Sequence, residues 1–119
     1  MSVESELVAV LRSACPRVFS DIAAVPPERP YVIWQGIGGP ATRYVDNQAA
    51  DKRRVRVTIT SWSESREAAN ALAQDIEARL ASAASIVGTP EAEAAAIVEP
   101  DNVPILYGAQ QDFLIVGAR

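Results

Sequence analysis

The chain contains no histidine, and this absence limits the chemistry that its side chains could perform. It excludes Ser-His and Cys-His nucleophile pairs, imidazole metal ligands and the usual general base near neutral pH. Carboxylates remain for acid–base chemistry, but those in the last third of the chain have no spacing that predicts a shared site. We therefore predict that the protein is not an enzyme, and we expect solvated surface groups at Glu91, Glu93, Glu99, Asp101 and Asp112.

A glycine cluster and a lone cysteine are the other features that could mark a site. The segment 36–40, Gly-Ile-Gly-Gly-Pro, lacks the Lys and Ser/Thr of a phosphate-binding loop, and Pro40 prevents it from opening a helix. We interpret it as a turn. Cys15 has no second cysteine for an internal disulfide, and its position before Pro16 favours a small, partly buried residue at a helix end. The sequence predicts no cofactor and no metal.

Basic side chains gather where a strand is predicted to begin, at Lys52, Arg53, Arg54 and Arg56. One interpretation is a solvated sheet face or edge, protected by its charge against unwanted pairing. The other is a contact surface for an acidic patch on a partner or on a neighbouring copy, because a guanidinium group can bind a carboxylate at two points. Nucleic-acid binding is disfavoured, since only Tyr44 and Trp62 lie nearby for stacking and the net charge is -4.

The basic cluster opens the stretch that organises the chain, residues 53–84. From Arg54 to Trp62, apolar residues alternate with Arg and Thr, which predicts a strand with one dry face. The period then changes to three and four and predicts a long helix that opens at Ser63, with an apolar stripe of Ala69, Leu72, Ala73, Ile76, Leu80 and Ala83. We expect this helix to fold back across the dry face of the sheet.

Other segments complete the predicted order. Residues 2–14 have helical spacing with Ser2 as a cap, and Pro16 ends the helix. Residues 18–25 are interpreted as an irregular packed segment, and residues 38–51 as a long hairpin loop. Gly88 and Pro90 are interpreted as residues that interrupt regular structure after the long helix. Further strands are predicted at 31–37, 95–99 and 110–116.

The predicted fold class is α+β, with a four-stranded, largely antiparallel sheet and two helices packed on one face, in the order α-β-β-α-β-β. At 119 residues we expect one domain spanning 1–119. No apolar run approaches the ~20 residues that a membrane helix needs, and acidic residues near the N-terminus are unlike a secretory signal. We expect a soluble cytosolic protein without a membrane partner.

The order of several segments resembles a known family. They are the strand Pro-Tyr-Val-Ile-Trp-Gln at 30–35, the strand at 54–62 that ends in Trp and is followed by Ser63, the alanine-rich helix at 64–80, and the terminal strand at 110–116. Together they resemble the tail-completion, or tail-terminator, proteins of siphophages and prophages, which are similar in fold to the minor tail protein U of lambda-like phages. The similarity covers nearly the whole chain. Residues 46–51 match no motif of the family.

This resemblance implies a structural protein that assembles into a hexameric ring, caps the tail tube, stops its polymerisation and forms the surface to which the head joins. The implied partners are other copies of the chain, the tail-tube protein and head-neck connector proteins. The implied location is the host cytoplasm during assembly and then the virion tail. We predict protein-interface residues at Arg43, Tyr44, Lys52, Arg53, Arg54 and Arg56.

Two alternatives remain open at this point. The first is another neck component, such as a head-completion or connector protein, which would share the size range and the lack of catalytic groups. The second is an unrelated ferredoxin-like domain that binds a small ligand, which would be marked by a pocket between helices and sheet.

Overall fold

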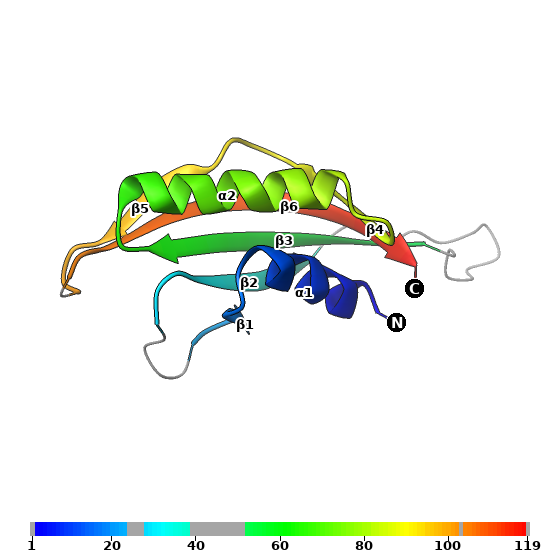
Figure 1. Ribbon diagram of the computed structural model, residues 1–119. Helices are drawn as coiled ribbons and strands as arrows, with labels where there is room; N and C mark the ends of the chain where they lie inside the picture. The colour runs from blue at the N-terminus through cyan, green and yellow to red at the C-terminus, as the bar shows by residue number, and fades with distance from the viewer. Residues whose placement is uncertain (1, 24–27, 39–51, 103, 119) are drawn as a thin grey trace.

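The computed structural model describes residues 2–23, 28–38, 52–102 and 104–118. Within these ranges, two helices and six strands follow one another in the order α-β-β-β-α-β-β-β. Figure 1 shows α2 running lengthwise along β3 and β6, with α1 beside it. The elements are α1 (Val3–Ala14), β1 (Val18–Ser20), β2 (Tyr31–Gly38), β3 (Lys52–Ser63), α2 (Arg66–Ala81), β4 (Ile86–Pro90), β5 (Ala95–Glu99) and β6 (Leu106–Ala118).

The sheet is built around the long pair β3 and β6. These strands are antiparallel and stay in register from the pair Lys52 and Ala118 to the pair Ser63 and Tyr107. On one side the sheet continues through β2, which is antiparallel to β3, to the short β1, which is parallel to β2. On the other side β6 pairs with both β4 and β5, each antiparallel and each on a different half of the strand. The sheet is therefore mixed, with β6 as a shared central strand.

The prediction of a four-stranded, largely antiparallel sheet in the order α-β-β-α-β-β is wrong: the sheet has six strands and is mixed. The segment at 18–20 was expected to be irregular, but it forms β1, a strand of three residues. The segment at 86–90 was interpreted as punctuation, but it forms β4. Gly88 and Pro90 are compatible with β4 because an edge strand tolerates a terminal proline, and because Gly88 leaves room for α2 above it.

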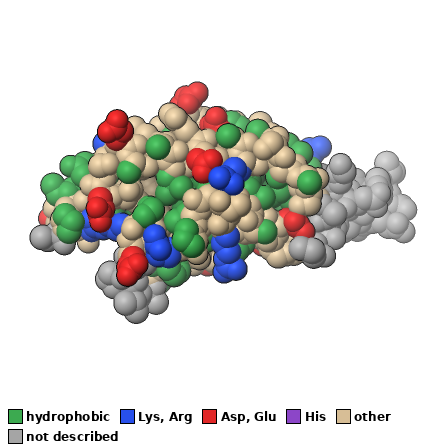
Figure 2. Space-filling model, viewed as in Figure 1, with side chains coloured by type: hydrophobic (Ala, Val, Ile, Leu, Met, Phe, Trp, Pro, Cys, Tyr) green, Lys and Arg blue, Asp and Glu red, His purple; other side chains and the backbone are tan. Residues whose placement is uncertain are grey.

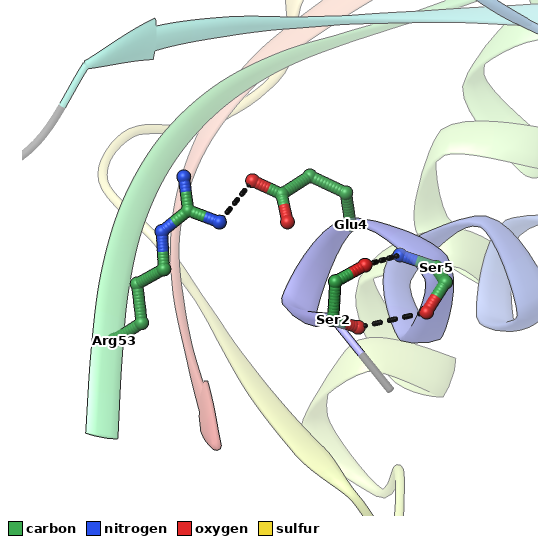
Figure 3. Close-up of polar contacts among 4 residues, drawn as sticks. All are labelled: Ser2, Glu4, Ser5 and Arg53. Atoms are coloured by element: carbon green, nitrogen blue, oxygen red, sulfur yellow. Dashed lines mark hydrogen bonds and ion pairs between the residues drawn. The ribbon is translucent and has the colours of Figure 1, made fainter. Parts of the chain in front are cut away.

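Serine caps begin both helices. Ser2 caps α1 as predicted, and its hydroxyl accepts a hydrogen bond of 3.1 Å from the backbone nitrogen of Ser5 (Figure 3). Helix α2 is capped by Ser65, whose hydroxyl accepts from the nitrogen of Ala68 at 3.1 Å. The predicted opening at Ser63 is wrong, because Ser63 still belongs to β3 and pairs with Tyr107.

The hydrophobic core lies between both helices and one face of the sheet. The predicted alternation in β3 is confirmed, since Val55, Val57 and Ile59 are buried while Arg54 and Arg56 are exposed. This buried face of β3 and β6 meets one stripe of each helix. The largest side chains buried there are Phe113, Leu7, Leu11, Ile76, Leu80, Ile86 and Ile115.

No helix formed by the described residues covers the opposite face of the sheet. We name it the open face; it presents the alternate residues of the strands, among them Ile33 of β2, Arg54 and Trp62 of β3, and Leu114 of β6. The long hairpin loop predicted over 38–51 lies, from residue 39 onward, outside the described residues. Neither of the two helices is long and apolar enough to cross a membrane, in the part of the chain that the structure describes.

Candidate functional site

The structure describes part of the set of residues predicted to form an interface. Arg43 and Tyr44 lie outside the described residues. Lys52 is the first residue of β3, and its backbone pairs with that of Ala118. The side chains of Arg53, Arg54 and Arg56 are described, and they do not share one face. Because side chains alternate along a strand, Arg53 lies on the helix side of the sheet, whereas Arg54 and Arg56 lie on the open face.

Arg53 makes an ion pair within the molecule. Its Nη1 donates to Oε1 of Glu4 in the first turn of α1, as Figure 3 shows. Glu4 also lies at the positive end of the helix dipole, where a carboxylate is stabilised. Both side chains remain about a third or more exposed, at 41% for Arg53 and 33% for Glu4. We infer that this ion pair helps to hold the start of α1 against the sheet and partly neutralises the charge of Arg53.

Arg56 also has an internal partner, but Arg54 has none among the described residues. The Nε of Arg56 lies 3.2 Å from Oε2 of Glu91, in the turn after β4. Arg54 is exposed, and its cross-strand neighbour is Val116, which in turn pairs with Val87 of β4. Val87 is 54% exposed. This row of one cation and two apolar side chains, Arg54, Val116 and Val87, is named the Arg54 row.

The rest of the open face is more apolar and better buried. Phe19 of β1 packs edge-on against Tyr31 of β2, with ring centroids 6.3 Å apart. Trp62 and Ile97 meet over Gly108, where an added Cβ would lie 2.7 Å from the indole ring. Figure 2 shows one side of the molecule, on which the described acidic and basic side chains are scattered among hydrophobic ones. On the open face itself, Arg54 and Arg56 are the exposed arginines of β3 among the described residues.

Tyr31 is the one group among the described residues with a resolved change in pKa. Burial raises the pKa of the Tyr31 phenol above its usual value of 10.0, Arg29 lowers it, and Glu99 raises it further. The folded state thus favours the neutral phenol. Stability from this preference is fully present below the usual pKa and is lost as the pH rises through the higher pKa of the folded state.

The Tyr31→Phe variant is therefore expected to lose less stability than the wild type at alkaline pH. The measurement is urea unfolding of both proteins at about pH 8 and about pH 11. At the higher pH, ionisation of this phenol stabilises the unfolded state of the wild type, and the variant has no such group. Equal losses in the two proteins would contradict the assignment of this pH dependence to Tyr31.

A groove lies on the helix side of the sheet, between α2 and the chain segment 93–96. Its volume is about 420 Å³. The lining combines small apolar residues with amides and carboxylates, and includes no Lys or Arg. It consists of Asn70, Ala73, Gln74, Glu77, Glu93, Ala94, Ala96 and Gln111.

Gln111 ties the sheet to both sides of this groove. Its Nε2 donates to Oε1 of Glu77 on α2 at 2.7 Å and to the carbonyl oxygen of Ala92 at 2.8 Å. The residue is 4% exposed, so these bonds satisfy a nearly buried amide nitrogen. The bond between Gln111 and Glu77 also holds that carboxylate toward the sheet.

The acidic residues that the sequence singled out lie apart. Glu93 lines the groove, Glu91 pairs with Arg56, and Asp112 accepts a hydrogen bond of 2.8 Å from Thr58. Glu99 and Asp101 are exposed. In the described ranges, no three His, Cys, Asp or Glu side chains come together in a way that could hold a metal ion.

Sequence reasoning missed Glu77 and Gln111 as members of one cluster. Glu77 lies within the predicted long helix and Gln111 within the predicted strand at 110–116, but neither was predicted to belong to a site. A signal was present, because Gln111 occupies an inward position of β6 between Ala109 and Phe113. A polar residue at such a position needs an internal partner, which points toward the facing helix.

Comparison with known proteins identifies a family to which the chain is similar. A search among curated proteins finds no match to the chain. The family model described as "Tail completion protein gp17" matches residues 2–116, almost the whole chain. This agrees with the resemblance drawn from the strands at 30–35 and 54–62, and it supports a role in phage tail assembly. The chain belongs to the family of tail completion protein gp17.

Proposed function

We propose that this tail completion protein caps the end of the phage tail tube, stops its polymerisation and forms the surface to which the head joins. It would do so as a ring of identical copies, with six copies as the expected number. Its partners would be the tail-tube protein on one side and head-neck connector proteins on the other. The protein would act in the host cytoplasm during assembly, in a phage or a prophage, and would remain in the virion tail.

The main support for this proposal is the family match over residues 2–116. The architecture is compatible with it, because the open face leaves one side of a six-stranded sheet available to other chains. Stable interfaces commonly bury more than about 1,000 Å². A small domain can supply such an area only from a broad surface, such as a sheet face or its edges.

Arg54 is the predicted interface residue that we expect to contribute most. Arg53 and Arg56 already pair with Glu4 and Glu91, so their charges are partly neutralised within the molecule. Arg54 is exposed beside Val116 and has no acidic partner among the residues described. Lys52, Arg43 and Tyr44 remain proposed contacts, since they precede or begin the same strand.

The proposal is tested by deleting the gene and measuring tail lengths by electron microscopy. Loss of a protein that stops the tube should give overlong tails without heads. Tails of normal length beside unjoined heads would instead identify a head-completion or connector protein, and would contradict the capping role.

A charge reversal at Arg54 tests the contact surface. We expect Arg54→Glu to fold normally, as judged by circular dichroism, and to fail to restore normal tail length to the deletion strain. Arg12→Glu is the matched control, since Arg12 is also exposed but lies on α1, away from the open face. Normal tails with Arg54→Glu would remove Arg54 from the interface.

The groove beside α2 is the observation that favours the ligand-binding alternative. A small ligand that binds the folded state there should raise the melting temperature, by an amount that grows with the logarithm of its concentration above its Kd. A screen of metabolites that gives such a rise, together with normal tail assembly by a groove variant, would favour this alternative.

A further inference from the structure

The groove has a chemical preference that follows from its hydrogen-bonding groups. The amide of Gln111 uses its nitrogen for Glu77 and Ala92, so the orientation of the amide is determined by two acceptors. Its Oε1 accepts no hydrogen bond from any described residue. No side-chain nitrogen or oxygen that is fully buried in the described part of the chain lacks a partner. Oε1 is therefore not fully buried, and because Gln111 lines the groove, we infer that Oε1 is accessible from it.

The charges of the lining add to this preference. Glu77 and Glu93 contribute carboxylates, and no cation lines the groove to neutralise them. Only one oxygen of Glu77 bonds to Gln111, which leaves the second oxygen available among the described contacts. Together with Oε1 of Gln111, these carboxylates give the groove several hydrogen-bond acceptors and a negative potential. The rest of the lining includes the alanines Ala73, Ala94 and Ala96. The chemistry that fits is a cation with several N–H donors.

We propose that the groove binds an arginine side chain, and that this arginine is Arg54 of a second copy of the chain. A guanidinium carries five N–H donors in a planar fork, so it can satisfy two carboxylates and an amide oxygen at once. The volume of about 420 Å³ is ample for one such side chain. Arg54 is the exposed cation of the open face that has no acidic partner among the described residues.

Neighbouring side chains on the two surfaces also match. Arg54 is followed across the strands by Val116 and by the 54% exposed Val87. Beside the groove, Val98 is 48% exposed and lies on the same side of β5 as Ala96, which lines the groove. Each surface thus places an exposed apolar side chain next to its polar group. We expect the Arg54 row of one copy to lie against the groove and Val98 of the next.

The relative placement of the two surfaces determines the kind of assembly. The groove is on the helix side of the sheet, and Arg54 is on the open face. A contact between two different surfaces is heterologous, so it repeats from copy to copy and closes into a ring when the rotation permits. This inference rests on the proposed ring and names the contact that builds it.

A charge swap between Arg54 and Glu93 provides the test. Glu93 is chosen because it is exposed and makes no internal hydrogen bond among the described residues, whereas Glu77 supports Gln111. The variants Arg54→Glu and Glu93→Arg should each weaken self-association by about tenfold or more, because each places like charges in the contact. The double variant should recover part of that loss, because the carboxylate introduced at residue 54 again faces a cation at residue 93, while Glu77 is unchanged. Sedimentation velocity over a range of protein concentrations measures these constants.

Two further measurements keep the test specific. Asp101→Arg is the control for Glu93→Arg, since Asp101 is exposed and lies outside the groove lining. The side-chain amide resonance of Gln111 should shift as the wild-type protein associates, and it should stay in place in Arg54→Glu at the same concentration. A purely structural role for Glu93 would not move that resonance.

Three results of the association experiments would overturn the inference. The first is self-association that neither single variant weakens. The second is a double variant that self-associates more weakly than either single variant. The third is a wild-type protein that stays monomeric up to millimolar concentration. The tail-length experiment stays separate from these results. Normal tail capping by both single variants would refute this contact while leaving the proposed function intact, whereas normal tails in the deletion strain would refute the function itself.

Discussion

Replacing Phe113 by alanine is expected to lower the free energy of unfolding by about 3–5 kcal/mol, the usual cost of removing a buried aromatic side chain. Phe113 is 1% exposed and is the largest of the fully buried side chains. It comes from β6 and faces both helices, so its loss opens a cavity in the centre of the core. Urea unfolding followed by circular dichroism measures the change, with the slope of the transition checked for two-state behaviour.

Leu114→Ala is the matched control for this prediction. Leu114 is the next residue of the same strand, but it points to the open face and is only half-buried. Its truncation removes fewer buried contacts, so it should cost clearly less than the loss of Phe113. A smaller effect at Phe113 than at Leu114 would contradict the placement of the core on the helix side.

Gly88→Ala is the second prediction with a large expected effect. A Cβ at residue 88 would lie 2.8 Å from the Cβ of Leu80 and 3.1 Å from Cδ1 of Ile115. The Cβ of Leu80 is fixed by the backbone of α2 and cannot rotate away, so the helix would have to move off β4. Overpacking of this kind costs about 1–3 kcal/mol. We expect a lower midpoint of urea unfolding and a loss of contact between α2 and β4.

Gly36→Ala is the control for Gly88→Ala. Gly36 also lies within a strand, but a Cβ there would have no neighbour within 4 Å. Alanine at that position should leave stability unchanged or raise it slightly, because it restricts the unfolded chain. If the two variants behaved alike, the close approach of α2 to β4 would not be the cause of the effect.

The long elements of this fold can be predicted from the sequence because their periodicity is local. The alternation of Val55, Val57 and Ile59 correctly gave β3, and the spacing of Ala69, Ile76 and Leu80 gave α2. The short strands could not be predicted in the same way. β1 has three residues and pairs in parallel with β2, so it is stabilised by contacts that no local pattern encodes. β4 was not predicted because it contains Gly88 and Pro90, two residue types that are common in turns.

The interface residues illustrate a different limit. Alternation along a strand already implies that Arg53 faces away from Arg54 and Arg56. That Arg53 meets Glu4 could not be derived, because the partners are far apart in the chain and belong to different elements. The groove could not be predicted from the sequence for the same reason. Its residues Glu77, Glu93 and Gln111 come from a helix, a loop and a strand that lie together only in the folded protein.

The position of β6 at the end of the sequence affects how the sheet can form during protein synthesis. Three strands pair with β6. Among the described residues, β4 and β5 pair with no other strand, whereas β3 also pairs with β2. Yet β6 follows all the other elements in the sequence, so the ribosome adds it after them. β4 and β5 must therefore wait, unpaired with β6, while translation proceeds. Closure of the sheet is an event that follows synthesis of the last strand, and nascent chains that stop before Leu106 would expose edges prone to aggregation.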